Sequence, residues 1–257
     1  MTDKRRHRLL TVARAWHLTP GMIRVTFAGK ALEGFPEDRE GANCKLLLPE
    51  PGETHNAFAE RLNNGPPPVR RTYTVRHFRP ELLELDIDFV DHGDTGPASA
   101  WARAAKPGDF LGFAGPGPVK VAAFGADFYL LAADMSAIPV VAATLEAMPR
   151  DARGLALFDV PSDRDIQQIA APDGVELRWL IQRDAHHSAQ AAAIRAMDWP
   201  AGRVQTCIAG EHGTIRDLKD YLIGTRQLPK GDAYISGYWK IGLVEDDHQA
   251  LKRSEAA

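Results

Sequence analysis

The sequence has little cysteine and no long apolar segment. Its two cysteines, Cys44 and Cys207, lie far apart in a chain of 257 residues. Two such residues cannot supply an iron–sulfur cluster or a structural zinc site, and nothing in the sequence supports a disulfide. No run approaches the roughly 20 apolar residues of a membrane helix, and the N-terminus has no apolar signal core. We therefore expect a cytoplasmic protein that uses neither a membrane nor a bound metal.

A strong excess of charge of one sign is also lacking. The chain has 31 Lys and Arg against 34 Asp and Glu, so its net charge is −3. This balance argues against a nucleic acid as the main partner, and it disfavours a nucleic-acid-binding barrel. The short basic run at residues 4–8 is expected to be a solvated arm. We expect the protein to act as a monomer on a small molecule.

The first half of the chain has the pattern of short strands separated by turns. Residues 50–68 are expected to form a polar, proline-rich loop, and residues 96–105 a helix with Pro97 near its start. The strands are expected at residues 9–16, 22–27, 45–48, 71–78, 82–90 and 110–114. Six short strands with little helix predict a small antiparallel β-barrel.

The second half alternates apolar runs with helical segments. Helices are expected at residues 137–148, 188–197 and 214–223, the last with a capping box formed by Thr214 and Asp217. The apolar runs lie at residues 128–133, 155–160, 175–181, 204–209 and 233–237. This alternation predicts an α/β domain with a parallel sheet. We place the two domains at residues 1–122 and 123–257.

The most informative segment is Arg-Thr-Tyr-Thr-Val-Arg at residues 71–76. In a strand, alternate side chains share a face, so Arg71 and Tyr73 lie on one face and Thr74 and Arg76 on the other. A guanidinium, an aromatic ring and a hydroxyl suit a planar ligand that carries phosphate. The alternative is a half-exposed barrel strand with two solvated arginines.

Other candidate positions lie at turns. A glycine-rich turn at residues 92–96 precedes the first expected helix, where free amides favour an anion, although an ordinary capped helix is the alternative. In a parallel sheet, ligands bind at the carboxyl ends of the strands. The residues that follow those ends are Asp134, Ser136, Glu211, Tyr238 and Trp239. The usual GxGxxG fingerprint is absent there, and caps, solvated acids or core aromatics remain alternatives.

Several motifs together resemble a known family. Arg71-Thr72-Tyr73-Thr74 resembles the RxYT/S flavin motif of the ferredoxin reductase superfamily. The further motifs are His92-Gly93, Gly96-Pro97-Ala98-Ser99 with Trp101, Pro107-Gly108-Asp109, Ala209-Gly210-Glu211 and Gly237-Tyr238-Trp239-Lys240. In this order, over residues 14–245, they resemble the siderophore-interacting proteins, which are flavin-dependent ferric-siderophore reductases of bacteria.

The resemblance implies an FAD-binding barrel followed by a domain for NADPH or NADH. Arg71 would hold the FAD pyrophosphate, Tyr73 would pack on the flavin, and Thr74 would bond near its reactive nitrogen. The remaining FAD contacts would be His92, Gly93, Gly96, Ala98, Ser99 and Trp101. The nicotinamide-side residues would be Asp134, Ser136, Glu211, Tyr238 and Trp239. The anionic siderophore would meet Lys45, Lys120 and Lys240, and Arg183 could meet a 2′-phosphate. Arg76 is left as a surface charge.

These assignments predict an electron relay from NAD(P)H, or from a ferredoxin, through FAD to Fe(III) in a siderophore. The flavin would supply the chemistry, and no side chain need act as an acid or base. One alternative is a flavin reductase with another acceptor, such as a quinone or a partner protein. The other is a non-catalytic siderophore-binding protein.

Overall fold

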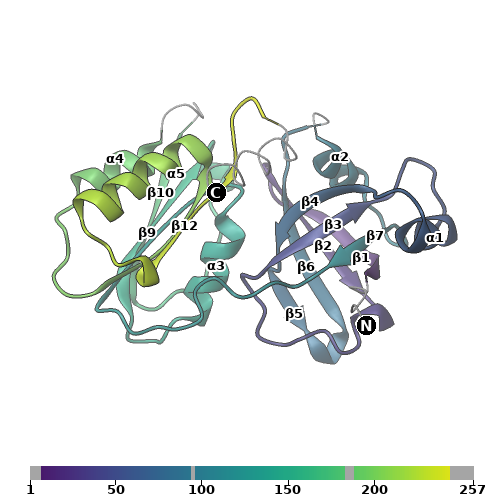
Figure 1. The fold of residues 1–257 in the computed structure, drawn as a ribbon, viewed down its shortest axis with the longest axis horizontal. Helices are drawn as coiled ribbons and strands as arrows, with labels where there is room; N and C mark the ends of the chain where they lie inside the picture. Colours follow the sequence, from purple (N-terminus) through teal and green to yellow (C-terminus); the bar gives the residue numbers. More distant parts are fainter. Residues whose placement is uncertain (1–6, 94–95, 183–187, 244–257) are drawn as a thin grey trace. The chain divides into compact units, whose positions relative to one another are not determined.

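The computed structural model describes residues 7–93, 96–182 and 188–243. The chain divides into two compact units, the first ending at Val119 and the second beginning at Lys120. Figure 1 shows a strand-rich first unit, and a second unit in which helices flank a sheet.

In the described part of the first unit, seven strands form one antiparallel sheet in the order β4-β3-β7-β1-β2-β6-β5. The strands are β1 (Arg8–Thr19), β2 (Met22–Ala28), β3 (Asn43–Leu48), β4 (Val69–Thr74), β5 (His77–Arg79), β6 (Glu84–Val90) and β7 (Phe110–Ala114). The two edge strands, β4 and β5, belong to one continuous segment of chain. This segment closes the sheet, so the predicted antiparallel barrel is confirmed.

The strand expected over residues 71–78 is two strands. β4 pairs with β3, whereas β5 pairs with β6. The chain changes partner at Val75, whose N–H donates to the Ala42 carbonyl, and at Arg76, whose N–H donates to the Asp86 carbonyl. One segment thus serves both edges of the sheet.

Alternating apolar residues fill the barrel. Phe27 on β2, Phe89 on β6 and Phe113 on β7 are fully buried in one core, and burial of each such ring stabilises the fold by roughly 1.5–3 kcal/mol. The helix α2 (Pro97–Ala104) begins after Gly96 with proline in its first turn, as expected, and packs Ala98 onto this core.

Residues 50–68 are not the expected irregular loop, because the helix α1 (His55–Asn64) lies within them. The Thr54 hydroxyl accepts a hydrogen bond from the helix at its N-terminus. Phe58 is fully buried and its ring centroid lies 5.8 Å from that of Phe110. A single buried aromatic in a polar helix gave too weak a periodic pattern for the helix to be predicted.

The second unit has a parallel sheet in the order β10-β9-β8-β11-β12, as predicted. Its strands are β8 (Phe128–Asp134), β9 (Arg153–Val160), β10 (Gly174–Ile181), β11 (Val204–Glu211) and β12 (Ala233–Trp239). Its helices are α3 (Ile138–Ala147), α4 (Ala189–Ala196) and α5 (His212–Lys219). On β8, Leu131 packs with α3, whereas Leu130 packs in the cluster that contains residues of α4 and α5. The helices therefore cover both faces of the sheet.

The predicted capping box of Thr214 and Asp217 is wrong. The helix α5 begins at His212, directly after β11, and Glu211 is its N-cap. The Glu211 carboxylate accepts a hydrogen bond of 2.9 Å from the Thr214 N–H. After Lys219 the chain continues into a wider π-helical turn, Asp220–Thr225.

Candidate cofactor-binding sites

The strand β4 presents the three residues predicted to contact flavin. The Tyr73 ring is half-buried and its centroid lies 4.4 Å from that of Phe89 in the barrel core. Thr74 is buried, and Arg71 is half-buried with its Nη1 donating to the Arg70 carbonyl at 2.9 Å. The core therefore supports one side of the tyrosine ring, which gives this ring a fixed orientation.

The start of α2 brings together four other predicted residues. The His92 N–H donates to the Ser99 hydroxyl at 3.2 Å, and Ser99 is buried. A Cβ atom at Gly96 would lie 2.7 Å from His92 Cε1, so only glycine allows the imidazole to approach this closely. Gly93 has a positive φ, and its N–H donates to Asp91.

An aromatic cluster connects these two elements. Trp101 of α2 has its ring centroid 5.9 Å from that of Phe89 and 6.2 Å from that of Phe27. Phe89 also contacts Tyr73. The predicted ring contact on β4 and the predicted phosphate contact at α2 are thus held by the same core.

These features fit FAD. No described side chain caps the start of α2, so its first amides remain available to a phosphate. Arg71 is a bidentate donor suited to a pyrophosphate, and Tyr73 offers a supported aromatic plane. Bound FAD would supply the redox chemistry, and these residues would hold and orient it.

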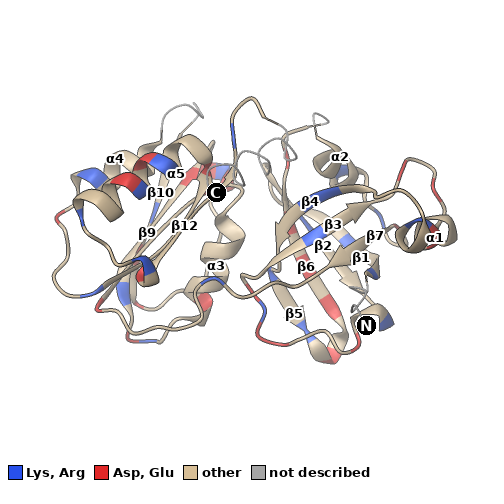
Figure 2. Ribbon diagram, in the orientation of Figure 1, with Lys and Arg blue, Asp and Glu red and all other residues tan. Residues whose placement is uncertain are grey.

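The outer face of the barrel carries charges that this site does not use. Glu84, Asp86 and Asp88 alternate with core residues along β6, and we call them the acidic ladder (Figure 2). Arg24 donates to both carboxylate oxygens of Asp88, at 2.6 and 2.8 Å. Arg79 does the same to Asp86, at 2.8 and 2.7 Å. Bidentate pairs of this kind fix side chains firmly.

The side-chain hydrogen-bond donors around Asp86 determine how it titrates. Burial alone would raise the pKa of Asp86, but hydrogen bonds from His77, Arg79 and Thr26 outweigh it. The pKa of Asp86 therefore lies well below its ordinary value. The carboxylate remains charged over the physiological range because its charge is matched by donors.

The expectation that Arg76 is a surface charge is wrong. Its side chain is buried, with Nη1 2.7 Å from His77 Nε2 and Nε 3.9 Å from Asp88 Oδ2. A guanidinium only donates, so His77 Nε2 accepts and the proton sits on Nδ1, which lies 3.3 Å from Asp86 Oδ2. The passage of the chain from β4 to β5 carries Arg76 across the acidic ladder.

At the carboxyl edge of the parallel sheet, three predicted nicotinamide-side residues form one hydrogen-bonded group. Asp134 Oδ1 accepts from the N–H of Ser136 at 2.9 Å and from its hydroxyl at 2.6 Å. Asp134 Oδ2 accepts from Trp239 Nε1 at 2.7 Å. Burial raises the pKa of Asp134 in spite of these donors.

The other two predicted residues at this edge have structural partners. Glu211 caps α5 and also accepts a weaker hydrogen bond from the Ile241 N–H at 3.4 Å. The Tyr238 hydroxyl lies 3.0 Å from that of Tyr234, and burial raises the pKa of Tyr234 to about 12.

Asp159 was not predicted, although it belongs to the same edge. It is the penultimate residue of β9, in register with Asp134, and it accepts from the Ser188 hydroxyl and the Gln190 N–H, each at 3.1 Å. Burial, with the nearby charge of Asp134, raises the pKa of Asp159 to about 6. An acid near the end of the apolar run at residues 155–160 was the available signal.

The predicted siderophore lysines lie in different units. Lys45 of the barrel donates to the Thr72 hydroxyl. Lys120 and Lys240 belong to the second unit, and burial lowers the pKa of Lys120. Arg183 lies outside the described residues.

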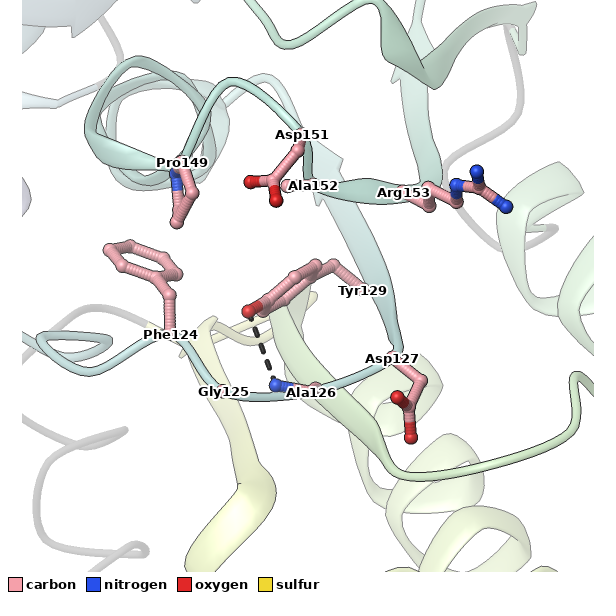
Figure 3. A pocket seen from close by; sticks show the side chains of 9 residues that line it. All are labelled: Phe124, Gly125, Ala126, Asp127, Tyr129, Pro149, Asp151, Ala152 and Arg153. Atoms are coloured by element: carbon pink, nitrogen blue, oxygen red, sulfur yellow. Dashed lines mark hydrogen bonds between the residues drawn. The ribbon is translucent and has the colours of Figure 1, made fainter.

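A cavity of about 570 Å³ lies at the opposite edge of the sheet (Figure 3). Phe124 and Tyr129 line it with their ring centroids 5.9 Å apart, and Asp151 and Arg153 are among its other lining residues. It adjoins the amino ends of β8 and β9, whereas ligands of such sheets bind at the carboxyl ends. We therefore do not assign it to the nucleotide.

No helix in the part of the chain that the structure describes is long and apolar enough to cross a membrane. No group of His, Cys, Asp or Glu within residues 7–93, 96–182 and 188–243 could hold a metal ion.

Comparison with known proteins identifies the family. Residues 11–120 match the siderophore-interacting FAD-binding domain, and residues 126–242 match the siderophore-interacting protein family. The chain is 33% identical to ferric vibriobactin reductase ViuB of Vibrio cholerae, over 93% of this chain and 91% of that protein. It is 32% identical to the NADPH-dependent ferric-chelate reductase of Escherichia coli K12, over 83% of this chain and 85% of that protein.

A solved structure agrees. The siderophore-interacting protein SipS from Aeromonas hydrophila superposes with a TM-score of 0.86 at 33% identity, covering 98% of this chain and 99% of that one. The sequence matches in both halves and the structural match over 98% of the chain therefore indicate the same family. The predicted resemblance is confirmed, and the chain belongs to the siderophore-interacting protein family.

Proposed function

We propose that this protein is an FAD-dependent ferric-siderophore reductase that releases Fe(II) in the cytoplasm. The observation that carries the proposal is the FAD-domain match over residues 11–120, together with the supported Tyr73 ring and the uncapped start of α2. The relatives named as ferric vibriobactin reductase and NADPH-dependent ferric-chelate reductase support the substrate class and a nicotinamide donor.

The electrons balance in two half-reactions. One NADPH or NADH delivers a hydride, which carries two electrons, and two ferric complexes each take one electron, with one proton released. Hard oxygen ligands hold Fe(II) less strongly than Fe(III), so reduction frees the iron. FAD, when bound, converts between the two-electron and the one-electron step.

The protein's own residues bind the FAD and orient it. Arg71 pairs with the FAD pyrophosphate, Tyr73 covers the flavin plane, and Thr74 donates near the reactive nitrogen. The start of α2, with Gly96, Ala98 and Ser99, receives the phosphates, and His92, Gly93 and Trp101 border the adenosine side.

Lysines meet the substrate in this proposal. The siderophore complex is anionic, and Lys45, Lys120 and Lys240 raise its local concentration although the chain as a whole is slightly acidic. Glu211 and Tyr238 shape the nicotinamide side. A ferredoxin remains a second possible donor.

The test begins with the visible spectrum of the purified protein, which should show about one FAD per chain. Under anaerobic conditions, NADPH or NADH should then bleach the flavin, and a ferric siderophore should restore its colour faster than a free ferric salt does. A colourless protein would indicate a binding protein. A flavin that no ferric siderophore oxidises faster than the salt would indicate a reductase with another acceptor.

A further inference from the structure

Trp239, at the end of the outer strand β12, is hydrogen-bonded to the end of the central strand β8. Its side chain is 38% exposed, yet its indole N–H donates to Asp134 Oδ2 at 2.7 Å. Asp134 ends β8 and Trp239 ends β12, and these strands are not neighbours because β11 lies between them. The hydrogen bond therefore spans a strand, which orders an aromatic side chain that burial alone would leave mobile.

Gly210 on β11 makes room for this bond. A Cβ atom at position 210 would lie 2.6 Å from Asp134 Oδ2 and 2.9 Å from Asp134 Cγ, and φ at Gly210 is +153°. Any side chain here would displace the carboxylate. The backbone of β11 thus provides the space through which Asp134 reaches Trp239.

Asp134 has no capacity left for a ligand. It receives hydrogen bonds from the Ser136 N–H, the Ser136 hydroxyl, the indole of Trp239 and the backbone N–H of Glu211. A carboxylate offers about four lone-pair sites, so these four donors fill it. Its negative charge would also repel a nucleotide phosphate.

Trp239 has used its one polar group in the same bond. An indole has a single donor and no acceptor, so what remains to a ligand is the flat apolar ring. Such a surface favours another planar ring, in a stacked or tilted contact. At the carboxyl edge of this sheet, the planar group expected from a nicotinamide donor is the nicotinamide itself.

We propose that Asp134 is a positioning residue that fixes the indole plane of Trp239, and that this plane receives the nicotinamide ring of the electron donor. The inference rests on the proposed function for the identity of the donor. It replaces the expected direct contact between Asp134 and the cofactor, and it keeps Trp239 as a contact.

The experiment uses the FAD-loaded protein and the variants Asp134→Ala, Asp134→Asn and Trp239→Phe, with the double variant D134A/W239F. Asp151→Ala, an exposed acid at the opposite edge of the sheet, is the matched control. The Trp239 indole ¹H–¹⁵N signal is assigned by its loss in W239F. It should move toward the free indole position in D134A, move less in D134N, which retains an acceptor, and stay in place in D151A.

Donor affinity is then measured by anaerobic reduction of the bound flavin with NADPH and with NADH. D134A and W239F should each raise the apparent Kd of the donor by roughly two- to tenfold, because both remove the hydrogen bond that holds the ring in place to stack on the nicotinamide. FAD content should not change. The double variant should be no weaker than W239F alone, because Asp134 acts only through the indole.

Four results would overturn the inference. One is an unmoved indole signal in D134A, and another is an unchanged donor Kd in spite of a moved signal. The third is a further loss of affinity when D134A is added to W239F, which would make Asp134 a direct contact. A parent protein whose flavin neither nucleotide reduces would overturn it as well.

Failure of the proposed function has a different signature. Flavin reduced chemically with dithionite is mixed with a ferric siderophore, which bypasses the nicotinamide site. If that step fails while the donor affinities and the indole signal behave as expected, the acceptor is wrong and the role of Asp134 stands.

Discussion

Carboxylates that are buried or half-buried have different kinds of partner in the two units. On the barrel, Asp86 and Asp88 of the acidic ladder each receive a bidentate arginine. At the carboxyl edge of the parallel sheet, Asp134 and Asp159 receive hydroxyl, indole and backbone N–H donors. Burial by itself raises the pKa of Asp86 as it raises those of Asp134 and Asp159, so the hydrogen-bonding partners decide the direction of the net shift.

This difference in partners distinguishes carboxylates that stabilise the fold from carboxylates that belong to a candidate binding site. A carboxylate matched by guanidinium is stabilised as a charge, and it holds neighbouring strands together at neutral pH. A carboxylate surrounded by neutral donors keeps part of the cost of burial, and it persists where its geometry has another use. The barrel ladder is therefore structural, whereas the sheet edge is where we expect ligand chemistry.

The largest effect should come from breaking the ladder. Asp86→Ala leaves Arg79 and Thr26 without their buried acceptor, and removal of one partner of a buried pair costs about 3 kcal/mol or more. Chemical denaturation should show this as a lower free energy of unfolding. Glu176→Gln, in an exposed pair with Arg178, is the control and should change nothing measurable. A loss below about 1 kcal/mol in Asp86→Ala would mean that the ladder is dispensable.

The next test separates two kinds of barrel arginine. Arg71→Ala removes the proposed pyrophosphate contact, so the FAD Kd should rise on the order of 10- to 100-fold, equivalent to about 1.5–3 kcal/mol. Stability of the apoprotein should barely change. Arg79→Ala should do the reverse, lowering stability with little effect on FAD, as measured by flavin fluorescence titration. Equal FAD affinity in Arg71→Ala and the parent would place the pyrophosphate elsewhere.

The pH dependence should have opposite signs in the two regions. The folded pKa of Asp159 is about 6, above the unfolded value of 3.8, so the contribution of Asp159 to stability increases as the pH falls from about 6 to 3.8. The slope is at most about 1.4 kcal/mol per pH unit. Asp86 has a lowered folded pKa, so its contribution is complete above 3.8 and is lost as the pH falls below that value.

Denaturation of the parent and of Asp159→Asn, measured from pH 7 to pH 4.5, isolates the contribution of Asp159 to the free energy of unfolding. The difference in unfolding free energy should move in favour of the parent by about 2 kcal/mol between pH 7 and pH 4.5. A difference that is flat over this range would show that Asp159 is solvated like an ordinary surface acid.

The smallest effect concerns the substrate lysines. Lys240 follows Trp239 at the carboxyl edge of the parallel sheet. A single half-exposed cation contributes up to about 1 kcal/mol to the binding of an anion. Lys240→Ala should therefore weaken ferric-siderophore affinity a few-fold and leave FAD content intact. Lys219→Ala, an exposed lysine of α5, should have no effect. If both variants bind the siderophore like the parent, Lys240 is not part of the substrate site.

Much of the fold was predictable because local patterns were strong. Apolar alternation marked the barrel strands, and continuous apolar runs marked the strands of the parallel sheet. The helix α1 was missed because only Phe58 of its residues is fully buried. The capping box at Thr214 was wrong because Glu211, which was expected in the turn after the strand, caps α5, and the helix begins at His212 with no intervening loop.

The sequence by itself determined the two kinds of unit, the family and the candidate residues, because each depends on residue types at short spacing. It could not place Arg76 over the acidic ladder, which requires the partner change between β4 and β5. Nor could it join Asp134 to Trp239, which are 105 positions apart. That bond exists only because β8, β11 and β12 lie side by side and Gly210 has no side chain. Contacts between distant segments depend on strand order and register, and these are decided when the sheet assembles.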